Sequence, residues 1–358
     1  MAILLVLGRH WPLEVRVLDP PLRQLAAVWQ CGGYLGVDLF FVLSGFLVAG
    51  LLLREQARHG SLQVGRFLLR RGFKIYPAFY LLLLVSLLSG LSDLPPTRER
   101  LLAEALYLQN YLGGCWNHTW SLAVEEHFYL LLPVTLLFLR RPADPARGPG
   151  SPGFRGILPL FLAVGGGCLA LRLSLPPSPA EGWGHLSATH LRLDGLTFGV
   201  LLAWLHHERP GLFGGLSLPA RWALGLFGLL LLLPAFVWDL ARHPWLSTSG
   251  LTLFYLGGGA LLVALLPARL SSRPARALGL VGRHSYSIYL WHMLMTRLAA
   301  MACLTWPELL PPWGWLALYL GGTLLVGVTL SLALEAPLLR LRDRLVPSRS
   351  GALVVRAD

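Results

Sequence analysis

The sequence of 358 residues predicts an all-α fold, a polytopic bundle of about ten transmembrane helices. Hydrophobic residues make up 55% of the chain and charged residues only 13%, and the mean hydropathy is +0.59. Apolar runs approach the ~20 residues that a helix needs to cross a bilayer, and clusters of Pro, Gly and Arg separate them. This composition is typical of a chain built mostly of membrane spans, so the lipid bilayer is its first expected partner.

The first apolar run is too short to complete a span. Only about ten apolar residues precede Arg9 and His10, half of the number required, so the first span is expected to be truncated and the gene product to begin upstream of Met1. The other spans are expected at about 29–53, 75–90, 118–139, 156–173, 190–206, 219–238, 248–266, 284–303 and 315–339. Residues 1–345 would form one integral membrane domain, and residues 346–358 a short cytoplasmic tail.

The basic residues predict how the chain is oriented in the membrane. If both termini are cytoplasmic, 21 basic residues lie on the cytoplasmic side and five on the outer side. The positive-inside rule therefore favours a multi-pass protein of the inner (plasma) membrane with both termini cytoplasmic. The net charge of +12 is then an orientation signal, and no nucleic-acid partner is expected.

The four cysteines show neither CxxC nor Cys/His spacing, so no metal site is expected. In the predicted topology Cys31 and Cys115 both lie at outer ends of spans. They are a candidate disulfide pair, since an oxidising compartment would allow them to join.

Residues 119–133, TWSLAVEEHFYLLLP, place two adjacent carboxylates inside a predicted span. An ionised side chain at bilayer depth costs at least ~2.5 to 3.5 kcal/mol, so such residues usually mark function. On a helix Glu125 and Glu126 point about 100° apart, so one can face the bundle interior while the other faces elsewhere. Ser121 lies one turn before Glu125 on the same face. The alternative is that the pair ends a helix near the membrane interface, where nearby tryptophans are also typical.

The span that contains GVDLFFVLSGFLVAG is rich in small residues, and Asp38 lies near its beginning. Small side chains let neighbouring helices approach closely. The residues expected to do so are Gly36, Ser44, Gly45 and Gly50. The serine is interpreted as packing, because LSGFL lacks the GxSxG elbow of a hydrolase nucleophile.

Six segments occur in the order AILLVLGRH, GVDLFFVLSGFL, RRGFKIYP, WSLAVEEHFYLLLP, RLDGLTFG and GRHSYSIYLWH, between residues 2 and 292. Together they resemble the acyltransferase 3 family of integral membrane O-acyltransferases. Members of that family modify polysaccharides, peptidoglycan, lipid-linked sugars and some antibiotics. Each phrase alone is a weak signal, whereas six in one order are specific.

The resemblance implies a catalytic histidine at His10. The arginine that precedes this histidine in the family would fall before Met1. The family's RxxR signature, proposed to meet acyl-coenzyme A on the cytoplasmic side, is similar to Arg71 and Lys74, so lysine replaces the second arginine and the bidentate fork is lost. Acyl-CoA, acetyl-CoA first of all, is the implied donor, and Arg70 is a further expected contact to it.

Acyl transfer from a thioester to a hydroxyl needs a base, a group that orients the base, and cations for the phosphates of the carrier. His10 is the candidate base, and Glu125 would orient it or stabilise its imidazolium. Alternatively, His10 itself is acylated and relays the acyl group. Arg71 and Lys74 would hold the phosphates, although basic residues at that position also suit topology alone.

The acceptor implied by the resemblance is a carbohydrate or glycolipid. Arg192 and Asp194 lie at the outer start of the sixth span, where they either pair with each other or line the acceptor entrance. Asp38 and Ser121 are further candidate substrate contacts.

Two other classes compete with this prediction. A transporter or flippase of a glycan or lipid-linked intermediate would also carry intramembrane charge, but the chain shows no internal repeat or paired broken helices. An MBOAT-type acyltransferase would use a histidine in a late span, such as His292. Here the polar landmarks are early, and His284 and His292 are expected to pack in the core or at the interface.

Overall fold

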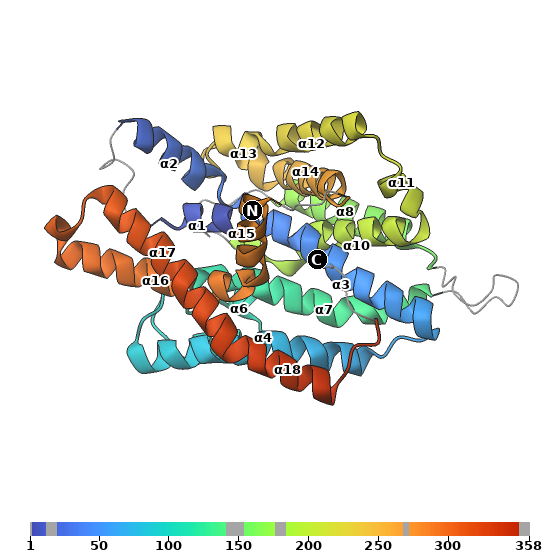
Figure 1. Cartoon of the computed structure of the whole chain (residues 1–358), viewed down its shortest axis with the longest axis horizontal. Coiled ribbons are helices and arrows are strands. Elements are labelled where there is room, and N and C mark those ends of the chain that lie inside the picture. Colours follow the sequence, from blue (N-terminus) through green and yellow to red (C-terminus); the bar gives the residue numbers. More distant parts are fainter. Residues whose placement is uncertain (1, 12–19, 141–153, 176–183, 268–271, 351–358) are drawn as a thin grey trace, which may run out of the picture.

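The structure is a computed structural model that describes residues 2–11, 20–140, 154–175, 184–267 and 272–350. The described residues form helices and no strand (Figure 1), so the predicted all-α bundle is confirmed. Seven helical segments are long and apolar enough to cross a membrane. They are Leu35–His59 (α3), Val64–Ser89 (α4), Asn117–Leu139 (η2 and α7), Ile157–Ser174 (α8), Leu218–Val237 (α12 and α13), Ser285–Thr305 (α16) and Pro312–Leu345 (α17, a π-helical turn and α18).

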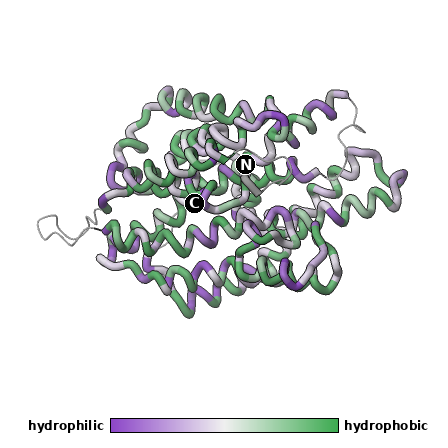
Figure 2. Tube along the Cα trace, turned by 180° about the vertical axis from the view of Figure 1, so that it is seen from behind, coloured by the Kyte–Doolittle hydropathy of each residue, from purple (hydrophilic) through white to green (hydrophobic). Residues whose placement is uncertain are grey.

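Three shorter helices occupy the remaining predicted spans, so every predicted span has a helical counterpart. They are Ala2–Arg9 (α1), Leu193–Glu208 (α10) and Ser249–Leu265 (α14). Connecting helices lie between the spans: Pro20–Gly32 (α2), Arg98–Ala105 (α5), Gln109–Leu112 (α6), Gly184–Ser187 (α9), Pro210–Gly214 (α11) and Arg273–Arg283 (α15). The protein is therefore a multi-pass membrane protein, with apolar residues along most of its trace (Figure 2).

The predicted boundaries of the second span are wrong at both ends. The predicted helix is interrupted between α2, which ends at Gly32, and α3, which begins at Leu35. At this point Gly33 packs so closely against α1 that a Cβ there would lie 2.5 Å from the Leu5 carbonyl oxygen. At the other end α3 continues to His59, and α4 begins at Val64. Residues 54–74, which lie between the second and third predicted spans, are thus mostly helical, and their basic side chains project from the ends of two helices.

Close packing of α3 against its neighbours rests on glycine, as predicted for Gly36 and Gly45. A Cβ at Gly36 would lie 2.5 Å from the Ala2 carbonyl oxygen of α1, and one at Gly45 would lie 2.0 Å from the Leu196 carbonyl oxygen of α10. Gly50 is different, because its nearest neighbour is the flexible side chain of Arg54, at 3.4 Å. The backbones of α1, α3 and α10 therefore touch at fixed points.

The last helical unit returns the chain to α4. A π-helical turn, Ser331–Glu335, joins α17 (Pro312–Leu330) to α18 (Ala336–Leu345), and Figure 1 shows α18 crossing beside α4. The turn aims Glu335 into the bundle, where Ser287 donates a hydrogen bond to it. Of the predicted tail, residues 346–350 fold back on α4, and residues 351–358 lie outside the described part of the chain.

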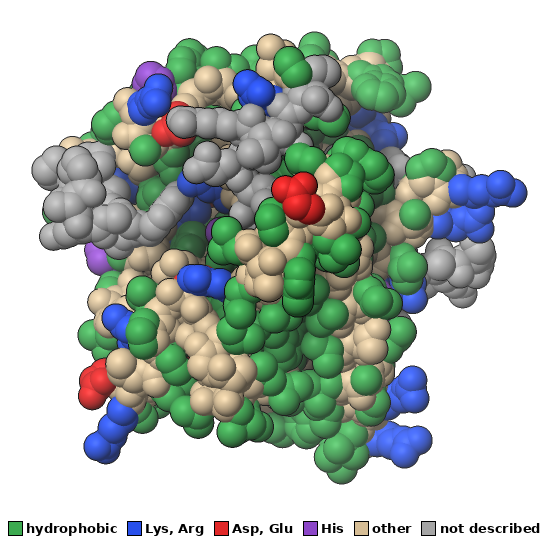
Figure 3. All heavy atoms as spheres, turned by 90° about the vertical axis from the view of Figure 1, so that its left-hand side faces the viewer, with side chains coloured by type: hydrophobic (Ala, Val, Ile, Leu, Met, Phe, Trp, Pro, Cys, Tyr) green, Lys and Arg blue, Asp and Glu red, His purple; other side chains and the backbone are tan. Residues whose placement is uncertain are grey.

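The surface agrees with a bilayer environment. Figure 3 shows a face covered largely by hydrophobic side chains, with Lys and Arg toward its edges.

The predicted disulfide between Cys31 and Cys115 is wrong, because both cysteines are free. The thiol of Cys31 lies 3.4 Å from the backbone oxygen of Trp238, whereas Cys115 is buried in a different part of the bundle, near Glu104.

Candidate active site

Three cavities follow one another along α3 and share lining residues. The basic cavity has a volume of about 500 Å³, and its polar lining includes Glu55, Arg66, Arg70, Arg71, Lys74, Arg342, Asp343 and Arg349. The middle cavity, of about 420 Å³, shares Leu51, Arg71 and Lys74 with it. The histidine cavity, of about 540 Å³, shares Val37 and Tyr289 with the middle cavity and is lined by His10, Asp38, His118 and Arg192 among others. The three cavities therefore form a series that begins at the basic residues and ends at His10.

The basic cavity is built on the first turns of α4 and closed by the end of α18. Arg66 donates hydrogen bonds to the backbone oxygen of Pro347, the shorter at 2.5 Å. Arg70 donates to the backbone oxygen of Val346 and pairs with Asp343, with 2.9 Å between Nη2 and Oδ1. Arg70, a predicted contact to the carrier, is thus already engaged by the chain itself.

Arg71 and Lys74 reach both the basic and the middle cavity. The Lys74 Nζ lies 3.8 Å from a carboxylate oxygen of Glu335. Arg71 forms no hydrogen bond or ion pair with any described residue, and its guanidinium carbon lies 5.7 Å and 5.2 Å from the ring centres of Phe67 and Tyr129. A guanidinium whose N–H groups are uncommitted is well suited to bind a phosphate.

Glu125 and Glu126 both border the middle cavity, although they were expected to face different ways. The Tyr129 hydroxyl donates to Glu125 at 3.0 Å, and the Ser44 hydroxyl lies 2.6 Å from that of Tyr129. Glu126 accepts instead from the Tyr76 hydroxyl of α4, at 3.2 Å. The two carboxylates thus have different partners, yet both side chains line the same cavity.

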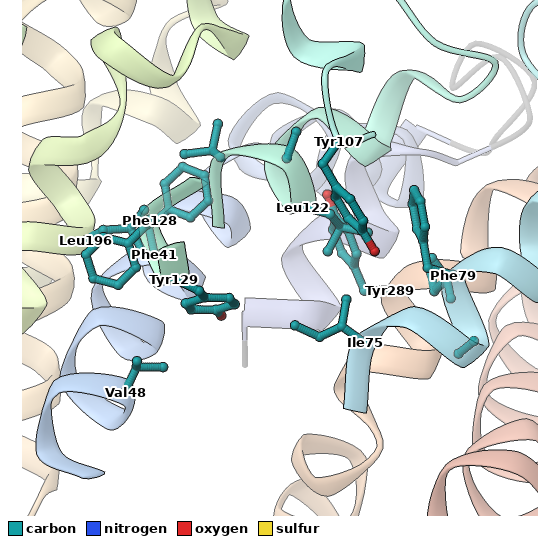
Figure 4. Close-up of a cluster of buried hydrophobic side chains, with 14 of the residues drawn as sticks. Phe41, Val48, Ile75, Phe79, Tyr107, Leu122, Phe128, Tyr129, Leu196 and Tyr289 are labelled. Carbon is teal, nitrogen blue, oxygen red and sulfur yellow. The ribbon is translucent and has the colours of Figure 1, made fainter. Parts of the chain in front are cut away.

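Tyr289 of α16 stands between the middle and the histidine cavities. Its hydroxyl lies 2.5 Å from that of Ser121 and donates to the His118 carbonyl oxygen at 2.7 Å. Figure 4 shows its side chain together with those of Ile75 and Tyr129, which come from two other helices. Ser121, a candidate substrate contact, therefore also holds Tyr289 in place.

His10 lines the histidine cavity at the end of α1. Its ring centre lies 5.0 Å from that of His292, and Thr296 donates to its backbone oxygen at 3.2 Å. No hydrogen bond joins His10 to Glu125 in the described part of the chain, where Glu125 is bonded to Tyr129. The structure does not bring these two predicted residues into contact, and their catalytic roles stay predictions.

Two further histidines pack beside His10, and sequence reasoning missed both. His292 was interpreted as a packing residue, and His118 was not singled out. Their ring centres lie 4.9 Å apart, and both side chains are buried. The signal that was available is the cost of an imidazole within an apolar span, which applies to His118 in NHTWSL and to His292 in SIYLWH.

One of the two predicted alternatives, that Arg192 and Asp194 pair with each other, is wrong. Arg192 pairs with Asp38, with 2.8 Å between Nη2 and Oδ1, and Asp194 pairs with Arg172 at 2.7 Å. Residues two apart around a helical start point in different directions, so the two side chains meet different helices. The Asp38–Arg192 pair lines the histidine cavity, whereas Asp194 lines none of the three cavities.

Glu104 of α5 fixes the turn that carries His118. It accepts hydrogen bonds from the backbone N–H of Trp116, at 2.8 Å, and from the hydroxyl of Thr119, at 3.3 Å. Burial raises the pKa of Glu104 to about 7, and these hydrogen bonds oppose the rise.

We expect Glu104→Gln to remove a pH-dependent contribution to stability. The folded pKa of about 7 lies above the ordinary value of 4.5, so this contribution is full below pH 4.5 and is lost as the pH rises through 7. Glutamine exchanges no proton in this range. Unfolding midpoints at pH 5 and pH 8 should therefore favour the wild type at pH 5 more than at pH 8, and a pH-independent difference would contradict the prediction.

The acyltransferase domain family matches residues 1–332, a range that includes the lining of the middle and histidine cavities. The chain belongs to the acyltransferase 3 family. This confirms the predicted resemblance and extends it beyond the six segments that carried it. No solved structure matches the chain.

Two relatives of this acyltransferase 3 chain are named for O-acetylation. O-acetyltransferase OatA of Staphylococcus aureus strain NCTC 8325 is 28% identical over 293 residues, which cover 75% of this chain and 47% of the relative. Peptidoglycan O-acetyltransferase OatA of Listeria monocytogenes is 29% identical over 293 residues, covering 74% and 45%. The chain thus matches about half the length of these relatives.

Proposed function

We propose that this acyltransferase 3 protein transfers an acetyl group from cytoplasmic acetyl-CoA to a hydroxyl of an envelope carbohydrate, with peptidoglycan as the first candidate. The observation that carries the proposal is the series of cavities that share lining residues from Arg71 to His10. The names of the relatives, O-acetyltransferase and peptidoglycan O-acetyltransferase, support the acyl group and the acceptor class.

The basic cavity is the proposed site of the nucleotide part of the donor. Coenzyme A carries a 3′-phosphate and a pyrophosphate, and Arg71 offers a guanidinium without a hydrogen-bond partner among the described residues. The positive-inside rule supports a cytoplasmic location for this end of the bundle, where coenzyme A is found, and for both termini in a plasma membrane protein. The largely apolar middle cavity would take the pantetheine arm and the thioester.

His10 is the proposed general base. It takes the proton of the acceptor hydroxyl while the oxygen attacks the thioester carbonyl, so that a C–O bond forms and the C–S bond breaks. The thiolate of coenzyme A then takes the proton from His10. The Asp38–Arg192 pair, in the same cavity, would offer polar contacts to the acceptor sugar.

The direct test is transfer by the purified protein in lipid nanodiscs, with [¹⁴C]acetyl-CoA and peptidoglycan fragments. The expected result is a labelled acetyl ester on the fragments, released by mild base, and free coenzyme A in equal amount. Neither product would form if the protein were a transporter, and their absence with acetyl-CoA and other acyl-CoA donors would overturn the proposal.

Arg71→Ala is expected to raise the KM for acetyl-CoA by about 10- to 100-fold, the equivalent of losing hydrogen bonds to a charged group worth ~1.5–3 kcal/mol. The kcat should change far less, because Arg71 does not touch the reacting atoms in this mechanism. Arg221→Ala is the matched control, since it removes the same charge from a side chain that bonds the Ala264 carbonyl and lines none of the three cavities. Equal KM values for the two variants would exclude this role for Arg71.

A further inference from the structure

Two imidazole nitrogens beside His10 are buried and have no hydrogen-bond partner in the described part of the protein: Nδ1 of His118 and Nε2 of His292. The side chains are almost fully enclosed, with exposed fractions of 3% and 0%. The other nitrogen of each ring meets a carbonyl oxygen, that of Leu290 for His118 Nε2, at 3.1 Å, and that of Tyr289 for His292 Nδ1.

These contacts decide which nitrogens carry hydrogen in the neutral rings. A carbonyl oxygen only accepts hydrogen bonds, so the ring nitrogen that faces it must be the donor. The unpaired nitrogens, His118 Nδ1 and His292 Nε2, are therefore both acceptors. An unsatisfied buried acceptor costs ~1–3 kcal/mol, and two of them in adjacent rings call for an explanation beyond packing.

The arrangement of the rings identifies the missing donor. His292 lies between the other two, with ring centres 5.0 Å from His10 and 4.9 Å from His118. His118 also lines the same cavity as His10. The described residues contain no group of three or more His, Cys, Asp or Glu side chains that could hold a metal ion. The donors that we consider are an N–H of His10, whose ring lies beside that of His292, and a hydroxyl of an acceptor bound in the cavity.

We propose that His292 positions His10 and that His118 positions the acceptor sugar, an inference that rests on the proposed function. When one ring nitrogen of His10 takes the proton of the acceptor hydroxyl, its other N–H donates to His292 Nε2. His118 Nδ1 accepts from a neighbouring hydroxyl of the acceptor sugar, while the attacking hydroxyl keeps its single proton directed at His10. Both rings stay neutral throughout, and their hydrogen bonds tighten only in the reacting complex, as is common in sites without substrate. The orienting role predicted for Glu125 falls to His292 in this proposal.

The test uses the fact that asparagine reproduces the Nδ1 position of histidine and glutamine the Nε2 position. His292→Gln keeps an acceptor where the proposal needs one, whereas His292→Asn keeps only the bond to the Tyr289 carbonyl. At His118 the order reverses, because His118→Asn keeps the acceptor and His118→Gln keeps the bond to the Leu290 carbonyl. We expect the kcat of His292→Gln to be at least tenfold higher than that of His292→Asn. The kcat of His118→Asn should likewise be at least tenfold higher than that of His118→Gln.

A purely structural role predicts the opposite order at both positions, since the variants that keep the carbonyl bonds would then be the better ones. Activities are normalised to folded protein from size-exclusion chromatography, and if one pair fails to fold the other pair decides. The KM for acetyl-CoA should stay within about twofold in all four. An inactive wild type would overturn the proposed function, whereas an active wild type with equal or opposite orders would overturn only the positioning role.

Discussion

His10→Ala is expected to lower the kcat for acetyl transfer by about 10²- to 10⁴-fold, the usual contribution of a general base. The KM for acetyl-CoA should change little, because Arg71 and the basic cavity lie at the other end of the series of cavities. The His10 side chain is partly exposed, and its hydrogen bonds to the described residues are made through its backbone N–H and backbone oxygen. The variant should therefore fold, and the measurement is initial-rate kinetics with [¹⁴C]acetyl-CoA.

The double variant His10→Ala/Glu125→Gln then tests the hypothesis that the two residues act as a unit. Residues that act as a unit lose activity non-additively, so the second substitution would cost little more. Because Tyr289 stands between their cavities, we expect instead that the two losses multiply. Full activity of His10→Ala would contradict both mechanisms that use His10, direct transfer and the acyl-histidine relay. In the relay, rapid quenching would also trap label on the wild-type protein.

The helical architecture could be predicted from the sequence because length and hydropathy report directly on membrane spans. The break between α2 and α3 could not, since it depends on how closely Gly33 approaches α1. A run of apolar residues contains no information about that approach. The same limit applies to residues 54–74, which lie between two predicted spans. In the structure α3 continues to His59 and α4 begins at Val64, so only a short turn separates the two helices.

The sequence offered candidate site residues one by one, but it did not indicate which residues are their partners. Arg192 meets Asp38 rather than its near neighbour Asp194, and His10 meets His292 from the far end of the chain. Such pairings arise from the tertiary packing of α1, α3, α10 and α16, which a single sequence does not reveal. What the sequence does reveal is that each of these side chains is polar within an apolar run. Such a position is energetically unfavourable in a membrane, and in the structure each of these side chains contacts another polar side chain.

Gly45→Ala is expected to be the most damaging single change to the fold. A Cβ at Gly45 would lie 2.0 Å from the carbonyl oxygen of Leu196 and 3.2 Å from the Cα of Gly199, so only a shift of the α10 backbone would make room. Overpacking of this kind typically costs ~1–3 kcal/mol, and a clash with backbone belongs at the upper end. Because α3 contributes to all three cavities, the shift should also abolish activity in the protein that still folds.

Gly50→Ala provides the matched control on the same helix. The nearest atoms to a Cβ there belong to the Arg54 guanidinium, 3.4 Å away and free to move, so the substitution adds helix propensity worth ~1 kcal/mol without a clash. We therefore expect thermal unfolding in nanodiscs to show a much lower midpoint for Gly45→Ala and an unchanged or higher midpoint for Gly50→Ala. Equal midpoints would mean that α3 and α10 do not pack through Gly45, and that the wall shared by the three cavities is built differently.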